Sequence, residues 1–197
     1  GAVIGDIAGS RFEFDNYRHT DFDIFSPDSD FTDDTICTVA IADWVLQGCN
    51  DNLASILQGW CRAYPCPKGA YGGRFSQWIE WKDPEPYNSW GNGSAMRVSA
   101  VGWAFATLEE TLHFAEQSAI VTHNHPEGIK GAQAVAAAIF WARTGMGKAQ
   151  IKENITRQFG YDLSQSCDQI RPHYLFNESC QETVPQAITA FLESDDF

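Results

Sequence analysis

The chain has 197 residues, of which 44% are hydrophobic and 13% aromatic, so it is long enough for a sizeable core and its composition is not that of a disordered chain. Its 13 Lys and Arg residues stand against 26 Asp and Glu residues. The resulting net charge of −13 argues against a nucleic-acid duplex or an anionic membrane as the main partner.

The six cysteines form no Cys-x-x-Cys pair and no close group with histidine, so the sequence indicates neither a zinc site nor a disulfide framework. We expect them to be buried free thiols in a reducing compartment, and we predict a cytoplasmic protein. Residues 1–10 are apolar but short, contain Asp6 and lack basic residues, unlike a signal peptide. No apolar run approaches the length of a membrane span.

The first polar residues of interest lie in "GDIAGSRFE", where Glu13 follows Ser10 by three positions. This spacing is that of a helix capping box. The alternative is that Glu13 is an acid held at the edge of a site, and both interpretations stay open.

The next segment, "FTDDT" at residues 31–35, precedes a predicted helix over 36–48. Thr and Asp are ordinary N-terminal helix residues, because their oxygens accept unpaired backbone N–H groups. However, a cap needs one such side chain, whereas this segment supplies the carboxylates of Asp33 and Asp34 and the hydroxyls of Thr32 and Thr35. The all-oxygen set is the one that Mg²⁺ or Mn²⁺ prefers, so the segment is a candidate cation site.

Helical periodicity also dominates the rest of the chain, and runs of β-branched residues are scarce. The sequence therefore predicts an all-α bundle. Further helices are predicted over 53–60, 94–106, 108–121, 127–144, 148–160 and 183–193. Two long stretches, 66–94 and 161–182, are predicted as loops, and the many aromatic residues of the first favour an ordered, functional loop.

The segment "NSWGNGSAMR", which starts at Asn88, combines two glycines with a predicted helix start. Backbone N–H groups at such a place can point at an anion, and the helix start adds partial positive charge. The alternative is a tight Asn-Gly turn. Farther along, "THNHPEG" offers His123 and His125 before a helix. A His-x-His pair can bind zinc but needs further ligands, so a substrate contact by His123 is the better interpretation.

These four segments occur in the order of the motifs of the ADP-ribosylglycohydrolase family, which the sequence resembles through "GDIAGSRFEF", "FTDDT", "GNGSAMRVSAVG" and "THNHPEGIKGAQAVA". The resemblance implies a compact orthogonal multi-helix bundle around two divalent cations, Mg²⁺ or Mn²⁺, which clamp the ribose hydroxyls of ADP-ribose. It also implies that residues 1–197 form a single domain of this type.

By the same resemblance, Thr32, Asp33 and Asp34 are metal ligands, and Glu13 is an acid near the metals that contacts substrate or gates the site. Glu13, Asp33 or Asp34 would orient or deprotonate the attacking water. His123 would contact the ligand near its phosphates. The loop that holds the diphosphate and adjoining ribose corresponds to Asn88, Ser89, Trp90, Gly91, Asn92, Gly93 and Ser94, with Trp90 placed to pack on the ligand.

One departure from the family pattern is a missing second ligand group, Gly-Gly-Asp-Ser/Thr-Asp-Thr, which has no counterpart in this sequence. We therefore expect an excerpt of a longer protein, cut at its C-terminal end. The implied function is metal-dependent removal of ADP-ribose from a modified acceptor, by cleavage at the ribose anomeric carbon. The alternative is a catalytically impaired fragment or pseudoenzyme that binds ADP-ribose.

Overall fold

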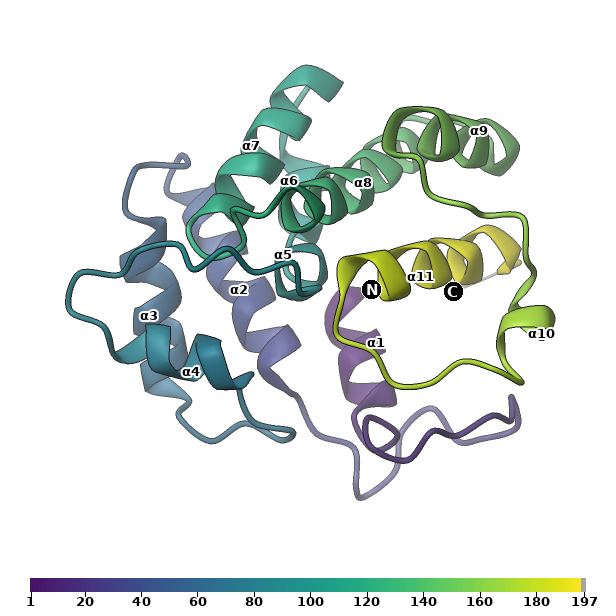
Figure 1. Ribbon diagram of the computed structural model, residues 1–197, viewed down its shortest axis with the longest axis horizontal. Helices are drawn as coiled ribbons and strands as arrows, with labels where there is room; N and C mark the ends of the chain where they lie inside the picture. The colour runs from purple at the N-terminus through teal and green to yellow at the C-terminus, as the bar shows by residue number, and fades with distance from the viewer. Residues whose placement is uncertain (196–197) are drawn as a thin grey trace. The chain divides into compact units, whose positions relative to one another are not determined.

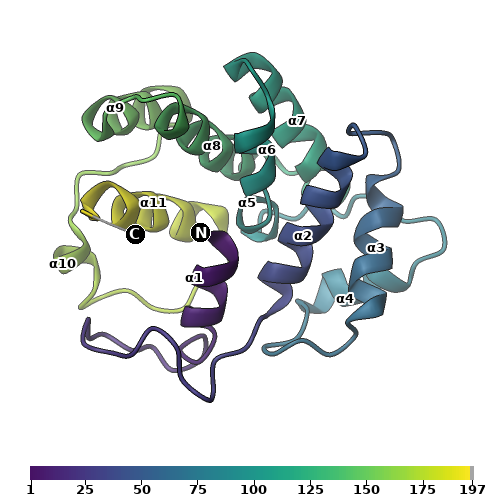
Figure 2. The same ribbon diagram turned by 180° about the vertical axis from the view of Figure 1, so that it is seen from behind.

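The computed structural model describes residues 1–195, and the prediction of an all-α protein is confirmed within them (Figures 1 and 2). Eleven helices account for the regular structure of these residues, and β pairing there is limited to two isolated bridges. The chain divides into two compact units, Gly1–Glu85 and Pro86–Phe197. The prediction of a single domain stays a prediction, and each unit is described by itself.

The first unit contains α1 (Ala2–Gly9), α2 (Asp33–Leu46), α3 (Leu53–Ala63) and α4 (Gly73–Glu80). Helix α2 packs against α3, and each helix has fully buried side chains, such as Ile41 in α2 and Leu57 in α3. Helix α1 packs beside α2, and α4 packs beside α3. Most of the apolar positions that predicted α2 and α3 are buried, and the others are half-buried.

Helix α4 lies inside the stretch 66–94 that the sequence predicted as a loop, so this part of the prediction is wrong. Eight residues are few for a helix in isolation, and tertiary contacts supply the missing stability. Trp78 is fully buried, and the buried Gln58 of α3 donates hydrogen bonds from Nε2 to the carbonyl oxygens of Trp78 and Trp81. These bonds satisfy the end of α4, where helical carbonyls lack partners.

The second unit contains α5 (Gly93–Met96), α6 (Ser99–Ala104), α7 (Leu108–Ile120), α8 (Pro126–Arg143), α9 (Lys148–Phe159), α10 (Cys167–Ile170) and α11 (Cys180–Glu193). Helix α8 is its centre, because α5, α6, α7, α9 and α11 all pack against it. Small residues permit this crowding: a Cβ added to Gly131 would lie 2.4 Å from Sγ of Cys180 in α11. The alanine-rich sequence of α8 thus encodes close helix contact on several sides.

Three predictions in this unit were wrong. The helix expected over 94–106 is broken into α5 and α6 around Arg97, whose side chain is 1% exposed. A buried guanidinium requires partners, and Nη2 of Arg97 donates to the carbonyl oxygen of Ser118 and to Oγ1 of Thr122. The predicted loop over 161–182 contains α10, and α11 begins three residues before the expected helix because Ser179 caps it.

Within residues 1–195, no helix combines the length and the apolar composition that a membrane span requires. All six cysteines are free, as the sequence predicted, but the prediction that they are buried is wrong for Cys66, which is exposed, and Cys49 and Cys167 are only half-buried.

Candidate functional site

The start of α2 holds the "FTDDT" segment, and its N-cap is Thr32. The Thr32 hydroxyl accepts a hydrogen bond from the backbone N–H of Asp34 at 3.1 Å. The cap interpretation is therefore confirmed for Thr32. Asp33 and Asp34 lie in the first helical turn, where the partial positive charge of the helix end favours carboxylates.

Two further carboxylates act on this pair. Burial raises the pKa of Asp33 from 3.8 to about 7, with the negative charges of Asp34, Glu13 and Asp6 adding to the effect. Burial likewise raises the pKa of Asp34 to about 7, with contributions from Asp6 and Glu13. The first unit therefore gathers four acidic side chains around one helix start, and a divalent cation would relieve their mutual repulsion.

The donor set at this place is a hydroxyl and carboxylates, which suits hard cations such as Mg²⁺ or Mn²⁺. Within residues 1–195, no three His, Cys, Asp or Glu side chains form a ready-made metal cluster. Thr32, Asp33 and Asp34 thus fit part of a cation's coordination shell, and Mg²⁺ commonly keeps several waters in the remainder. The prediction of two bound cations stays a prediction.

Glu13 follows the end of α1, where Ser10 is the C-cap rather than an N-cap, so the capping-box interpretation is wrong. The Ser10 hydroxyl donates to the carbonyl oxygen of Ile7 at 3.0 Å. Glu13 instead lies against Gly69: a Cβ added there would be 2.3 Å from Oε2 of Glu13. Gly69 also has a φ of +79°, so this position favours glycine for two reasons.

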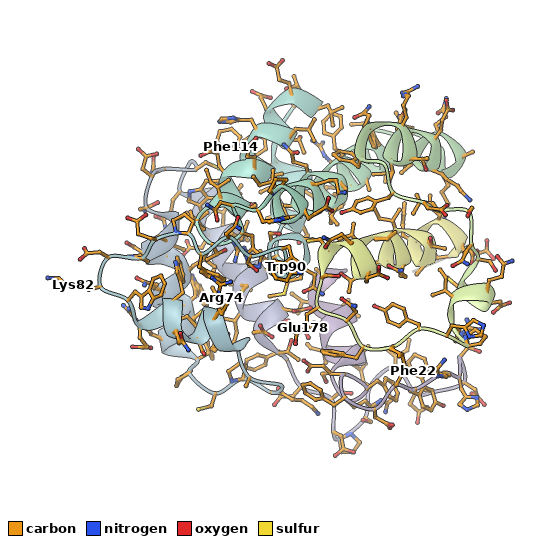
Figure 3. The ribbon with its side chains drawn as sticks, in the orientation of Figure 1. Phe22, Arg74, Lys82, Trp90, Phe114 and Glu178 are labelled. Carbon is orange, nitrogen blue, oxygen red and sulfur yellow. The ribbon has the colours of Figure 1, made fainter. Side chains whose placement is uncertain are left out.

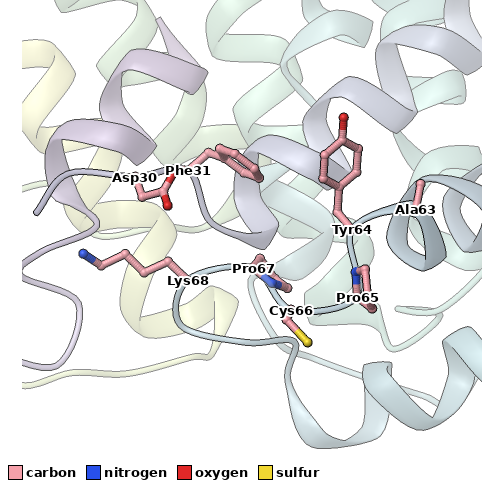
Figure 4. Close-up of a pocket in the computed structure, with 8 residues that line it drawn as sticks. All are labelled: Asp30, Phe31, Ala63, Tyr64, Pro65, Cys66, Pro67 and Lys68. Atoms are coloured by element: carbon pink, nitrogen blue, oxygen red, sulfur yellow. The ribbon is translucent and has the colours of Figure 1, made fainter.

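The loop that carries Gly69 also contacts residues 31–35, which we call the cation segment, because Lys68 forms an isolated parallel bridge with Thr32. Beside this bridge is a pocket of about 240 Å³, lined by residues 63–68 together with Asp30 and Phe31 (Figure 4). This loop lies in the stretch 66–94 that the sequence predicted as a functional loop, but its contacts with Glu13 and Thr32 were not predicted. Its glycine-rich "KGAYGG" run is the signal that marks a close backbone approach.

In the second unit, the loop 88–94 uses some of its backbone N–H groups in hydrogen bonds within the protein, which leaves fewer of them to bind an anion. Asn88 has a φ of +55°, and its N–H donates to Oδ1 of Asn124 at 2.7 Å. The N–H of Gly91 donates to Oγ of Ser89 at 3.1 Å. The N–H of Gly91, which was expected to point at an anion, therefore fixes the shape of the loop instead.

The same loop is tied to the segment that precedes α11, in the region where Figure 3 labels Trp90 and Glu178. The N–H of Asn92 donates to the carbonyl oxygen of Glu178 at 2.7 Å, and the N–H of Cys180 donates to that of Trp90 at 3.0 Å. The Trp90 side chain stays 51% exposed, which leaves its ring available to a planar ligand group. These two backbone hydrogen bonds fix the loop 88–94 to residues 178–180.

Ser94 has a structural role. Its side chain is fully buried, and Oγ donates to the carbonyl oxygen of Gly128 in α8 at 2.7 Å. Gly128 separately permits a close approach of the loop backbone, since a Cβ there would lie 2.7 Å from the carbonyl oxygen of Ser89. A direct contact between the Ser94 hydroxyl and a ligand would require this bond to break.

His123 lies against the loop 88–94, next to Gly91 and Gly93, and is 5% exposed. Burial, aided by the positive charge of Arg97, lowers its pKa well below 6.5, so the ring is neutral. Nδ1 is 2.7 Å from Oγ1 of Thr122, which accepts from Nη2 of Arg97 at 2.9 Å. Nε2 points toward the loop, because a Cβ added to Gly93 would lie 2.9 Å from it.

His125 serves a different purpose. It is the N-cap of α8, and its Nδ1 accepts from the N–H of Glu127 at 3.1 Å. Its ring also lies edge-on to Trp90, with the ring centroids 6.0 Å apart. Because one nitrogen is used in the cap, the arrangement gives no support to the alternative of a zinc site built on His123 and His125.

The structure thus brings Thr32, Asp33, Asp34 and Glu13 together in the first unit, and loop 88–94 and His123 together in the second. The role of Asp6 at the first group was not predicted. Its contacts cross 26 to 29 residues of sequence, a separation at which no local pattern is informative.

Comparison with known proteins gives two findings. The family model described as ADP-ribosylglycohydrolase matches residues 1–197. The ADP-ribosylhydrolase ARH3 of Xenopus tropicalis is 26% identical over 173 aligned residues, which cover 74% of this chain and 49% of that protein. The chain therefore spans about half the length of this curated relative.

Proposed function

Because the chain belongs to the ADP-ribosylglycohydrolase family, we propose that it acts in the metal-dependent hydrolysis of ADP-ribose from a modified acceptor. The bond cleaved is the N- or O-glycosidic bond at the ribose anomeric carbon. The observation that carries the proposal is the gathering of Asp33, Asp34, Glu13 and Asp6 at the start of α2. Helix capping alone gives no reason for four carboxylates at one place.

In this proposal Thr32, Asp33 and Asp34 hold divalent cations, Mg²⁺ or Mn²⁺. When bound, these ions would fix the ribose hydroxyls and stabilise negative charge on the attacking water. Asp33 and Asp34 are neighbours in the first turn of one rigid helix, so their carboxylates need little reorganisation to act together.

Glu13 receives the role of orienting or deprotonating the water, because the two aspartates are engaged as ligands. Cleavage of a glycosidic bond passes through an oxocarbenium-like transition state, so a well-placed water and a nearby carboxylate both lower the barrier. The close contact with Gly69 limits the positions open to the Glu13 carboxylate.

Loop 88–94 and His123 are assigned to the diphosphate and adjoining ribose, with Trp90 packing on the ligand. The hydrogen bonds support this for His123: if the Thr122 hydroxyl, which accepts from Arg97, donates to Nδ1, the ring proton is on Nε2. A neutral imidazole would then donate from Nε2 to a phosphate oxygen. The cytoplasm is the proposed location of the reaction.

A second candidate is a protein that binds ADP-ribose without turning it over. It is favoured by one observation: Thr32, Asp33 and Asp34 are the only ligand group that the sequence matches to the family pattern. Both candidates require the cation segment, so they differ in turnover and not in binding.

The test is release of ADP-ribose from Arg- and Ser-modified peptides in the presence of Mg²⁺ or Mn²⁺. We expect turnover that stops on chelation, and the Glu13→Gln variant should lose turnover while still binding ADP-ribose in calorimetry. Turnover that survives complete chelation would refute the metal-dependent mechanism. Binding without turnover in the unaltered chain favours the second candidate, and absence of both under saturating metal rejects both.

A further inference from the structure

Asp6 of α1 makes four hydrogen bonds to the cation segment. Its Oδ1 accepts from the Thr32 hydroxyl at 2.6 Å. Its Oδ2 accepts from the N–H of Thr32 at 2.9 Å, and from the N–H and the hydroxyl of Thr35 at 3.1 and 2.5 Å. One carboxylate therefore accepts hydrogen bonds from both hydroxyl groups of the segment, those of Thr32 and Thr35. Charge-assisted bonds of this kind are stronger than neutral ones.

The segment is held to α1 at a second point as well. The hydroxyl of Ser10, which is 5% exposed, accepts from the N–H of Asp30 at 3.1 Å. Since the chain from residue 30 to residue 35 is fixed at both ends, Asp6 has little freedom to exchange its partners. The hydrogen-bond partners of Asp6 are thus fixed within the first unit.

The bonds of the Thr32 hydroxyl decide what its oxygen can still do. A threonine hydroxyl has one proton and two lone pairs. The proton goes to Asp6, and one lone pair accepts from the N–H of Asp34. One lone pair remains, on an oxygen that carries no proton directed outward. An oxygen with this arrangement is a suitable cation ligand, whereas a hydroxyl with its proton turned outward would repel a cation.

We propose that Asp6 is a positioning residue that withdraws the Thr32 hydroxyl proton from the site and so makes this oxygen a ligand for a divalent cation. The inference rests on the proposed function, because it concerns the same cation. Asp6 itself does not contact the ion. The competing explanation is structural: Asp6 stabilises the start of α2 and has no specific effect on cation binding.

The variant that separates the two explanations is Asp6→Asn. Three donors converge on Oδ2, so the amide oxygen is expected at that position and the amide NH₂ at the position of Oδ1. Three of the four hydrogen bonds are then retained. The NH₂ group donates to Thr32, consumes the remaining lone pair and forces the hydroxyl proton outward.

Two controls accompany it. Thr35→Val removes one of the other bonds to Asp6 but leaves the Thr32 hydroxyl bond intact. Asp43→Asn also removes one negative charge, but from α2 at a position ten residues after Asp33, roughly 15 Å away along the helix axis. Asp43 accepts from Gln47 and Trp60 and has no hydrogen bond to the cation segment among the described residues.

The measurement is binding of Mn²⁺ alone to the whole chain, by calorimetry and by the electron paramagnetic resonance signal of free Mn²⁺, with urea unfolding of the same variants in the absence of metal. We expect Asp6→Asn to weaken Mn²⁺ binding at least about tenfold, the range typical of residues that orient metal ligands. Thr35→Val and Asp43→Asn should stay within about threefold of the unaltered chain, well below that range.

Two results would overturn the positioning role and leave the proposed function in place. One is Asp6→Asn binding Mn²⁺ as tightly as the unaltered chain. The other is that Thr35→Val loses as much affinity for Mn²⁺ as Asp6→Asn does, with the loss of affinity in both variants proportional to the loss of free energy of unfolding. An unaltered chain that binds no Mn²⁺ overturns the proposed cation site and the positioning role together.

Discussion

Replacing Asp33 with Asn should stabilise the metal-free protein above neutral pH, because it removes a buried negative charge that three neighbouring carboxylates also repel. The pKa of Asp33 is raised from 3.8 to about 7, and about 1.4 kcal/mol corresponds to each pKa unit, so the electrostatic cost is up to about 4 kcal/mol. Loss of the favourable interaction with the helix N-terminus offsets about 0.3–1 kcal/mol of this. We therefore expect a net gain of up to about 3 kcal/mol in the free energy of unfolding.

The sign of the pH dependence follows from the raised pKa. The folded state binds the Asp33 proton more tightly than the unfolded state, so the cost is absent below about pH 3.8. It grows as the pH rises toward the folded pKa of about 7 and is complete above it. The stability gap between Asp33→Asn and the unaltered chain should consequently widen across this window.

The assay is urea unfolding followed by tryptophan fluorescence at several pH values, with and without Mg²⁺. Saturating Mg²⁺ should stabilise the unaltered chain, by about 2.7 kcal/mol at a hundredfold excess over Kd, and should have little effect on Asp33→Asn. Asp43→Asn is the matched control, because hydrogen bonds from Trp60 and Gln47 lower the pKa of Asp43 and the substitution should not stabilise. A less stable Asp33→Asn variant above neutral pH, or equal Mg²⁺ stabilisation of both proteins, would refute the reasoning.

Two further predictions concern packing and protonation. Gly131→Ala places a Cβ 2.4 Å from Sγ of Cys180 and should lower the free energy of unfolding by about 1–3 kcal/mol. Gly59→Ala adds a Cβ in open space on α3 and should raise the free energy of unfolding by up to about 1 kcal/mol. Equal effects of the two substitutions in urea unfolding would contradict this prediction. The depressed pKa of His123 means that stability falls as the pH drops below 6.5, so His123→Gln should flatten the pH profile by up to about 1.4 kcal/mol per pH unit. An unchanged slope would show that the pKa of the buried His123 ring is not lowered on folding.

The sequence by itself determined the helices whose apolar residues repeat over several turns. It predicted α7 and α8 nearly to their ends, because periodicity and capping are local properties of the chain. It missed α4 and α10, which are too short to be stable alone, and it did not predict the break at Arg97. Each of these depends on partners that are distant in sequence, such as Gln58 for α4.

The candidate site divides in the same way. The sequence alone identified Thr32, Asp33 and Asp34 as a group, because adjacent residues at a helix start share one location whatever the rest of the fold does. The family resemblance already placed Glu13 near this group, but only the tertiary structure decided that the carboxylate of Asp6 joins it and that the Thr32 hydroxyl donates to Asp6. The physical reason is that a hydrogen bond across 26 residues depends on the packing of α1 beside α2, which no local pattern encodes.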